Sequence, residues 1–118
     1  GRRIVAYDIS EMAIRKAKAS YPNIDFRVGD GLTAAKSGGY DCAVMSQTLY
    51  VQSDWREVIA EAAARCNWLV IHEYVPAETQ WHIPDIWSLM LEVEKHCAID
   101  TKIVMNDDRV LLVGQSRR

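Results

Sequence analysis

The stretch IVAYDISEMAIRKAKASYPNIDFRVGDG, residues 4–31, sets the pattern that the rest of the chain repeats. It opens with a short apolar run rich in β-branched residues, Ile4 to Tyr7, and changes to helical spacing from Ser10 to Tyr21. Pro22 ends this helix, and residues 24–28 then alternate apolar and polar side chains, as in a strand with one wetted face. The order strand, helix, strand predicts a parallel βαβ unit.

The rest of the chain continues this alternation of strands and helices. Continuously apolar runs predict strands that are covered on both faces, and apolar stripes at helical spacing predict helices that lie on the sheet. The predicted elements are strands at 42–45 and 68–71, helices at 55–66 and 86–97, a loose Ala- and Gly-rich stretch at 32–39, and a closing antiparallel hairpin at 101–113. We therefore predict an α/β fold whose first four strands are parallel.

Composition narrows the classes of function that the chain can serve. Its 118 residues, 49% hydrophobic and 25% charged, suit one globular domain spanning 1–118, and a net charge of −2 without a basic stripe argues against nucleic acid as a partner. No apolar run is long enough for a membrane span, and no leader is evident. Cys42, Cys66 and Cys97 lack metal or redox spacing, which indicates free thiols in the cytoplasm.

Two acids follow predicted parallel strands, at the sheet edge where ligands of such folds bind. Asp8 is placed to accept hydrogen bonds from a ribose diol, but its spacing to Glu11 also fits a helix capping box, which local grounds favour. Asp30 lies in Gly-Asp-Gly, an ordinary tight turn, yet its carboxylate could also accept a hydrogen bond from an adenine amino group. The residues alone leave both readings open.

Polar side chains after the next two strands form a second group of candidates. Ser46, with the polar loop that follows it, could orient a small nucleophile, or it could simply precede the next helix. His72 and Glu73 could act as a base and its orienter, but adjacent residues of a strand point to opposite faces, so we expect the pair to be split. Trp81 and Trp87 are interpreted as packing groups.

Three segments in this order, AYDISEMAIRKAKASYPNIDFRVGDGL, YDCAVMSQTLYV and LVIHEYVP, resemble the class I S-adenosylmethionine-dependent methyltransferases from their second strand onward. The resemblance implies a Rossmann-like, mostly parallel sheet with an antiparallel C-terminal hairpin. It also implies S-adenosylmethionine as cofactor. In this reading Asp8 holds the ribose, Ile9 packs on the adenine, Asp30 contacts the adenine amino group with Gly31 and Leu32 beside it, and Ser46 begins the loop that contacts cofactor and substrate.

The chain departs from this family at its N-terminal end. The first strand and the glycine-rich loop of the family would stand before Gly1, so the fold is expected to be incomplete there. That strand is normally central, and its loss exposes the edges of the strands at Ile4 and Cys42. We expect either that these two strands pair directly, or that a second copy, as in a homodimer, or a separate segment fills the gap.

Three functional readings follow from the sequence. The first is methyl transfer to a small molecule; it nominates no catalytic residue, although Tyr50, His72 and Tyr74 are candidates for a base. The second is a non-catalytic methyltransferase-like remnant or fragment that acts as an oligomeric or partner-binding module. The third is another doubly wound binding domain, which the chain fits less well because it lacks the clustered acids and late Lys of a receiver domain.

Overall fold

The computed structural model describes residues 2–76 and 82–118 of the chain. The first unit consists of β1 (Val5–Asp8), α1 (Glu11–Ser20) and β2 (Asp25–Val28). β1 and β2 pair in parallel, from Val5 opposite Asp25 to Asp8 opposite Val28, and they form a two-stranded sheet. The predicted parallel βαβ unit is confirmed.

A four-stranded sheet holds the rest of the described chain. Its strands lie in the order β3-β4-β6-β5; β3 and β4 are parallel, and β6 is antiparallel to both of its neighbours. The remaining elements are α2 (Gly31–Lys36), β3 (Tyr40–Ser46), the 3₁₀ helix η1 (Leu49–Val51), α3 (Trp55–Arg65), β4 (Cys66–Tyr74), α4 (Ile86–Glu94), β5 (Cys97–Met105) and β6 (Arg109–Ser116). The mixed sheet with a closing hairpin agrees with the predicted fold class.

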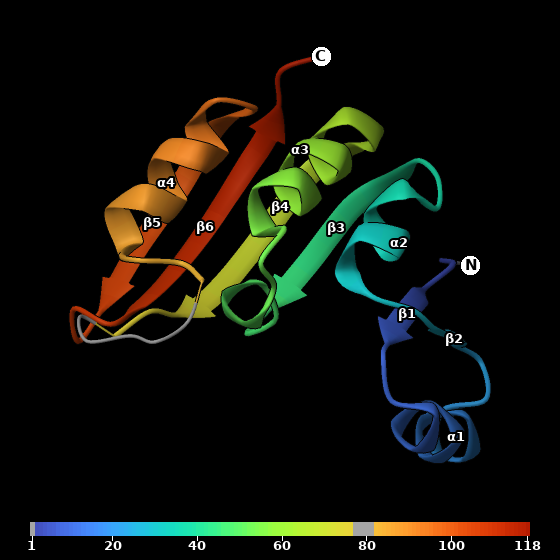
Figure 1. Ribbon diagram of the computed structural model, residues 1–118. Coiled ribbons are helices and arrows are strands. Elements are labelled where there is room, and N and C mark those ends of the chain that lie inside the picture. Colours follow the sequence, from blue (N-terminus) through green and yellow to red (C-terminus); the bar gives the residue numbers. More distant parts are fainter. Residues whose placement is uncertain (1, 77–81) are drawn as a thin grey trace.

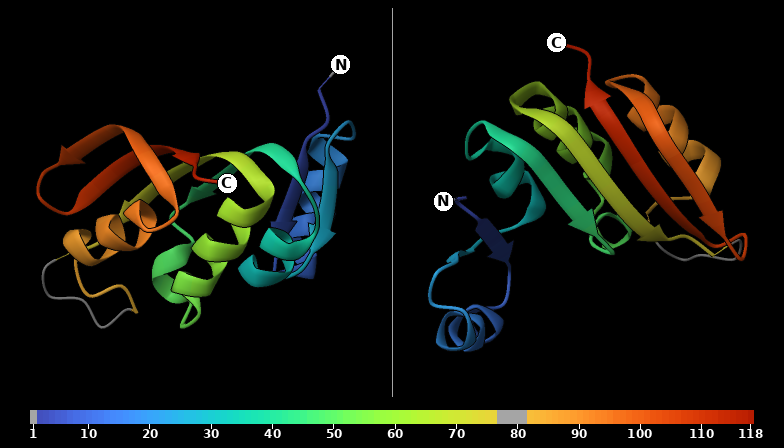
Figure 2. Two further views of the ribbon diagram at one scale, coloured as in Figure 1. Left: turned by 90° about the horizontal axis from the view of Figure 1, so that it is seen from above. Right: turned by 180° about the vertical axis from the view of Figure 1, so that it is seen from behind.

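The helices α3 and α4 lie against one face of the larger sheet (Figure 1). Between them and the sheet lies the core, which is centred on Leu49, Trp55, Ile59, Leu69 and Ile71. Seen from behind, no helix of the described chain covers the opposite face of this sheet (Figure 2). Val44 of β3 is therefore 70% exposed. The prediction that this strand is covered on both faces is wrong for the described chain.

The two sheets are separate because β1 and β3 do not pair. In the described residues β1 bonds only with β2, and β3 bonds only with β4. The expectation that the strands at Ile4 and Cys42 close directly on each other is therefore wrong. Each of the two strands keeps one edge whose backbone groups have no partner strand among the residues that the structure describes.

Several local predictions need correction. The stretch expected to be a loose loop at 32–39 contains most of α2, because Asp30 caps this helix. Cys66 does not end α3 but begins β4. Trp87 is 68% exposed, so it is not a packing group, and α4 instead buries Leu89, Met90 and Val93. Trp81 lies outside the described residues.

The hairpin prediction is confirmed at its turn. Asn106 and Asp107, between β5 and β6, both have positive φ, at 55° and 61°. Asn and Asp tolerate this left-handed region better than most residues. None of the helices in 2–76 and 82–118 has the length and apolar character needed to cross a membrane.

Candidate functional site

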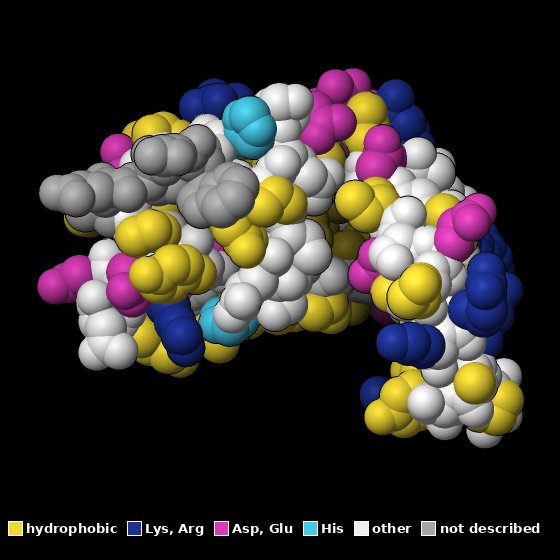
Figure 3. Space-filling view, turned by 60° about the horizontal axis from the view of Figure 1, so that its bottom comes forward, with side chains coloured by type: hydrophobic (Ala, Val, Ile, Leu, Met, Phe, Trp, Pro, Cys, Tyr) yellow, Lys and Arg dark blue, Asp and Glu magenta, His cyan; other side chains and the backbone are white. Residues whose placement is uncertain are grey.

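The carboxyl ends of the parallel strands gather the predicted site residues at one edge of the molecule. β1 ends at Asp8, β2 ends two residues before Asp30, and β3 ends at Ser46. The backbone N–H of Gly29 donates to the carbonyl oxygen of Asp8 at 3.0 Å, so the turn after β2 lies beside the end of β1. Figure 3 views the surface toward this edge and shows a projecting part on the right, which Figure 1 identifies as β1, β2 and α1. The surface is indented between this part and the body of the larger sheet.

Asp8 does not cap α1, contrary to the reading that local grounds favoured. The N-cap is Ser10, whose hydroxyl accepts a hydrogen bond from the backbone N–H of Ala13 at 3.1 Å. Asp8 Oδ1 accepts from the backbone N–H of Ser10 at 2.8 Å, because the chain needs this tight turn to pass from strand to helix. No residue in 2–76 or 82–118 bonds the other oxygen, Oδ2, and the side chain is exposed.

Asp30 is the N-cap of α2. Its Oδ1 accepts a hydrogen bond from the backbone N–H of Thr33 at 2.8 Å. Hydrogen bonds from the backbone and side chain of Thr33 lower the pKa of Asp30, so the carboxyl is ionised at neutral pH. The side chain is exposed and remains open to a ligand while it caps the helix.

The three apolar or small residues of the predicted site differ in their surroundings. Ile9 is 74% exposed beside Asp8, so its side chain is available to a planar ligand. Gly31 is the first residue of α2, and Leu32 is half-buried against the core. The structure thus brings Asp8, Ile9, Asp30 and Gly31 to one surface, whereas Leu32 is partly committed to packing.

Ser46 and His72 pair across the ends of β3 and β4. The two residues are partners in the strand register, and Ser46 Oγ lies 3.2 Å from His72 Nδ1. Glu73 points to the opposite face and is fully buried. The prediction that His72 and Glu73 are split is confirmed, and the partner of His72 is Ser46.

Glu73 has a role that the sequence did not reveal. Its Oε1 accepts hydrogen bonds from the backbone N–H groups of Thr48 at 3.0 Å and of Leu49 at 2.8 Å, which start η1. Burial raises the pKa of Glu73, and hydrogen bonds from the backbone N–H groups of Leu49, Thr48 and Tyr50 oppose that shift. The only signal in the sequence is an acid at the end of an otherwise apolar strand.

The remaining candidates lie farther from Asp8 and Asp30. Tyr50 packs against the core within η1, and Tyr74 is 37% exposed at the end of β4 with the guanidinium of Arg109 5.9 Å from its ring. The part of the chain that the structure describes holds no group of three or more His, Cys, Asp or Glu side chains that could bind a metal.

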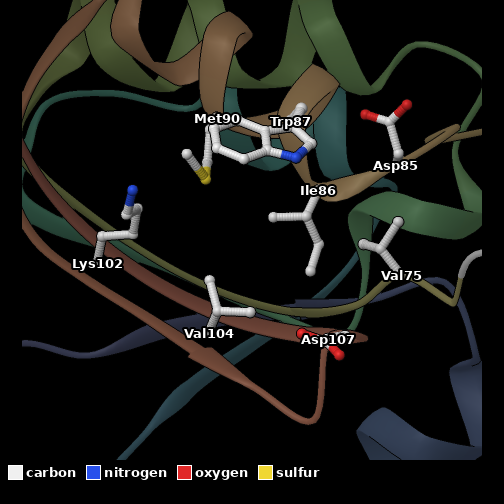
Figure 4. Close-up of a pocket in the computed structure, with 8 residues that line it drawn as sticks. All are labelled: Val75, Asp85, Ile86, Trp87, Met90, Lys102, Val104 and Asp107. Carbon is white, nitrogen blue, oxygen red and sulfur yellow. The ribbon is translucent and has the colours of Figure 1, made fainter.

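A cavity of about 290 Å³ lies between α4 and the β5–β6 hairpin (Figure 4). Trp87, Met90 and Lys102 line it, with Asp85 and Asp107 among the other residues of its wall. Asp85 is occupied as the N-cap of α4, since it accepts from the backbone N–H of Ser88 at 2.7 Å. This cavity adjoins β5, which lies at the far side of the sheet from β3, so it is separate from the edge that carries Asp8 and Asp30.

The family model described as "Methyltransferase domain" matches residues 1–66. This match spans more than half of the 118 residues, and the chain belongs to the methyltransferase domain family. Comparison with curated protein sequences gave no match.

Solved structures show the same fold at low sequence identity. PH0226 protein from Pyrococcus horikoshii is 15% identical with a TM-score of 0.79, over 99% of this chain and 73% of its own. A TehB-like SAM-dependent methyltransferase from Corynebacterium glutamicum is 14% identical with a TM-score of 0.78, over 98% and 68%. The N-methyltransferase NodS from Bradyrhizobium japonicum, in complex with S-adenosyl-L-homocysteine, is 14% identical with a TM-score of 0.80, over 98% and 67%. The chain therefore spans about two thirds to three quarters of these proteins.

Proposed function

We propose that this methyltransferase domain binds S-adenosylmethionine and directs its methyl group to a small molecule. The observation that carries the proposal is the pair of exposed carboxylates, Asp8 and Asp30, on neighbouring parallel strand ends. Family membership and the S-adenosylhomocysteine bound by NodS support the choice of cofactor. A relative of the same fold, the N-terminal domain of EvdMO1, was solved with S-adenosylhomocysteine and D-fucose, which supports a small acceptor.

The residues at this edge fit the nucleoside part of that cofactor. Asp8 Oδ2 can accept from the ribose hydroxyls because Oδ1 is already fixed by the Ser10 amide. Ile9, 74% exposed, offers an apolar side chain to one face of the adenine. Asp30 is held ionised and can accept from the adenine amino group, and Gly31 lies directly beside it at the start of α2. When bound, the cofactor supplies an electrophilic methyl group.

The acceptor is placed at the end of β3, next to the pair formed by Ser46 and His72. Both side chains are polar, and the 3.2 Å contact between them fixes the orientation of the imidazole ring. Imidazole can take up the proton that an O–H or N–H acceptor loses when it is methylated. The chain's task is then to align the acceptor with the methyl group, which is where most of the rate gain in such a transfer arises.

A second candidate function is a partner-binding module, and the unpaired strand edges favour it. β1 and β3 each offer one row of backbone groups, and Val44 is 70% exposed beside them. A strand from a second copy or from a separate segment could bond both edges. A separate segment that carries the family's first strand, unlike a second copy of this chain, would also supply the loop that holds the methionine end of the cofactor. The two functions can therefore coexist in one assembly.

The free thiols support a proposal for the compartment. Cys42, Cys66 and Cys97 are unpaired, and the last two are buried. Free thiols of this kind persist in a reducing cytoplasm, which we propose as the location.

The test is calorimetric titration of the folded chain with S-adenosylhomocysteine, with the molar mass measured in parallel. We expect saturable binding that Asp8→Ala abolishes and that Asp41→Ala, a change of another exposed aspartate on β3, leaves unchanged. A folded chain that binds no S-adenosylhomocysteine, or that binds it equally well after Asp8→Ala, would contradict the cofactor site. Self-association in that case would favour the partner-binding module.

A further inference from the structure

Gln52 lies between η1 and α3, and its side chain folds back toward the end of β3. Its backbone N–H donates to the carbonyl oxygen of Leu49 at 3.0 Å, and its own carbonyl accepts from Trp55 at 3.3 Å. The side-chain Nε2 donates to the carbonyl oxygen of Thr48 at 2.9 Å. Three hydrogen bonds therefore fix both the backbone and the side chain of this half-buried residue.

The other end of the Gln52 amide lies against Gly31. A Cβ atom placed on Gly31 would stand 2.2 Å from Gln52 Oε1 and 2.8 Å from Nε2, which is far inside van der Waals contact. The end of the Gln52 side chain thus fills the space beside Gly31. Any larger residue at this position would displace the amide.

The loop that holds Gln52 is itself anchored to the larger sheet. Thr48 accepts from the Gln52 side chain through its carbonyl oxygen and donates through its N–H to the buried carboxyl of Glu73 on β4. Gln52 therefore joins an anchored loop to the first residue of α2. The ion pair between Lys36 and Glu57 at 3.9 Å also links α2 to α3, but both side chains are about half exposed, so it contributes little.

This contact bridges the two parts of the proposed site. Asp30 and Gly31 follow the small sheet, and Ser46 ends a strand of the large sheet, with no strand pairing between the two sheets in the described chain. The relative position of the two parts comes from side chains that touch both, and Leu32 and Ala35 of α2 pack against the core. Gln52 adds a contact directly beside Asp30, because it lies against Gly31 and belongs to the loop that follows Ser46.

We propose that Gln52 is a positioning residue of the cofactor site, which sets the Asp30–Gly31 corner relative to the end of β3. The inference rests on the proposed function for its consequence in binding, but the contact itself is a property of the free chain. Loss of the amide should let the corner move and should weaken cofactor binding about tenfold, within the range by which single network residues alter coupling. Gln52 does not contact the reacting atoms in this account.

The test combines Gln52→Ala, Gly31→Ala and the double variant, with Gln115→Ala as the control because Gln115 is an exposed glutamine on β6. In the free chain, Gln52→Ala should shift the backbone amide resonances of Gly31 and Thr33, whereas Gln115→Ala should not. S-adenosylhomocysteine affinity should fall about tenfold in either single variant. It should fall no further in the double variant, because both changes break one contact.

The outcomes separate this inference from the proposed function. Unchanged amide resonances at Gly31 and Thr33 in Gln52→Ala would overturn the positioning role whether or not the cofactor binds. Binding losses that simply add in the double variant would overturn it as well. If the unaltered chain binds no S-adenosylhomocysteine, the proposed function fails, while the amide resonances still decide whether Gln52 holds the corner.

Discussion

Replacing the buried carboxyl of Glu73 should change both the stability of the chain and its dependence on pH. Glu73 is fully buried at the end of β4, and its Oε1 holds the N–H groups of Thr48 and Leu49 at the start of η1. Burial raises its pKa above the ordinary value of 4.5. The protonated carboxyl is therefore favoured in the folded chain relative to the unfolded chain.

The sign of the pH effect follows from this shift. Stabilisation by Glu73 is fully present below the unfolded pKa and is lost as the pH rises through the higher folded pKa. The free energy of unfolding should therefore decline as the pH is raised from about 4.5. Glu73→Gln keeps an oxygen acceptor for the two amides but cannot ionise, so its unfolding free energy should lack this decline.

A second variant, Glu73→Leu, separates the hydrogen bonds from the charge. Leucine fills similar space but accepts nothing, so the buried N–H of Leu49 is left without a partner. An orphaned buried amide costs about 1–3 kcal/mol. We expect Glu73→Leu to lose about this amount at about pH 5. The loss should shrink toward about pH 8, because ionisation of the buried Glu73 destabilises the unaltered chain but cannot affect the leucine variant.

Urea unfolding, followed by the fluorescence of the four tryptophans, which include the buried Trp55, measures these changes. The dependence of the unfolding free energy on urea should stay constant, because the surface exposed on unfolding is the same. Glu94→Gln is the control, since Glu94 is an exposed glutamate on α4. The reasoning is refuted if Glu73→Gln retains the pH dependence of the unaltered chain, or if Glu73→Leu is as stable as the unaltered chain at about pH 5.

Three further predictions concern the turns that shape the site. Ser10→Ala should lower the free energy of unfolding by about 1 kcal/mol, because it removes the cap of α1, and Asp8→Ala should lower it by less. Urea unfolding of both variants measures the two losses. Equal losses would contradict the assignment of Ser10 as the cap. The pKa of Asp30 is lowered, so its stabilising effect is present above the ordinary value of 3.8 and is lost as the pH falls through the lower folded value. Asp30→Asn should therefore weaken the loss of thermal stability at acid pH. If that loss is unchanged in the variant, Asp30 is not its source. Gln47 has a φ of 54°, a conformation that strains a residue with a Cβ, so Gln47→Gly should raise the free energy of unfolding by about 1 kcal/mol. Urea unfolding measures this change. A lower free energy of unfolding would show that the Gln47 side chain stabilises the chain by more than the strain costs.

The sequence predicts the elements whose pattern is regular and local. The period of the apolar residues was sufficient for β1, α1 and the closing hairpin, and the left-handed turn residues Asn106 and Asp107 mark that hairpin by their chemistry. α2 was missed because its six residues include Gly31 and carry no clear apolar stripe. Its start depends on one capping bond from Asp30.

Contacts between distant segments explain what the sequence could not show. Glu73 binds amides 24 and 25 residues earlier, and Gln52 lies against Gly31, so neither role leaves a local pattern. The apolar run of β3 predicted a strand covered on both faces, but Val44 is exposed because no helix of the described chain covers that face. The sequence correctly placed three polar residues at or just after strand ends: Asp8, Asp30 and Ser46. Parallel strands end at the same edge of a sheet irrespective of the contacts that their side chains make, so this placement needs only the order of the strands.

The central claim is that the nucleoside part of S-adenosylmethionine binds at the carboxyl ends of β1 and β2. The most direct measurement is a map of backbone amide resonances in the isotope-labelled chain during titration with S-adenosylhomocysteine. We predict saturable shifts at Asp8 to Ser10, at Asp30 to Leu32 and at Ser46, with β5 unaffected. Shifts confined to the cavity between α4 and the β5–β6 hairpin, or no shifts at all in a folded chain, would contradict the account.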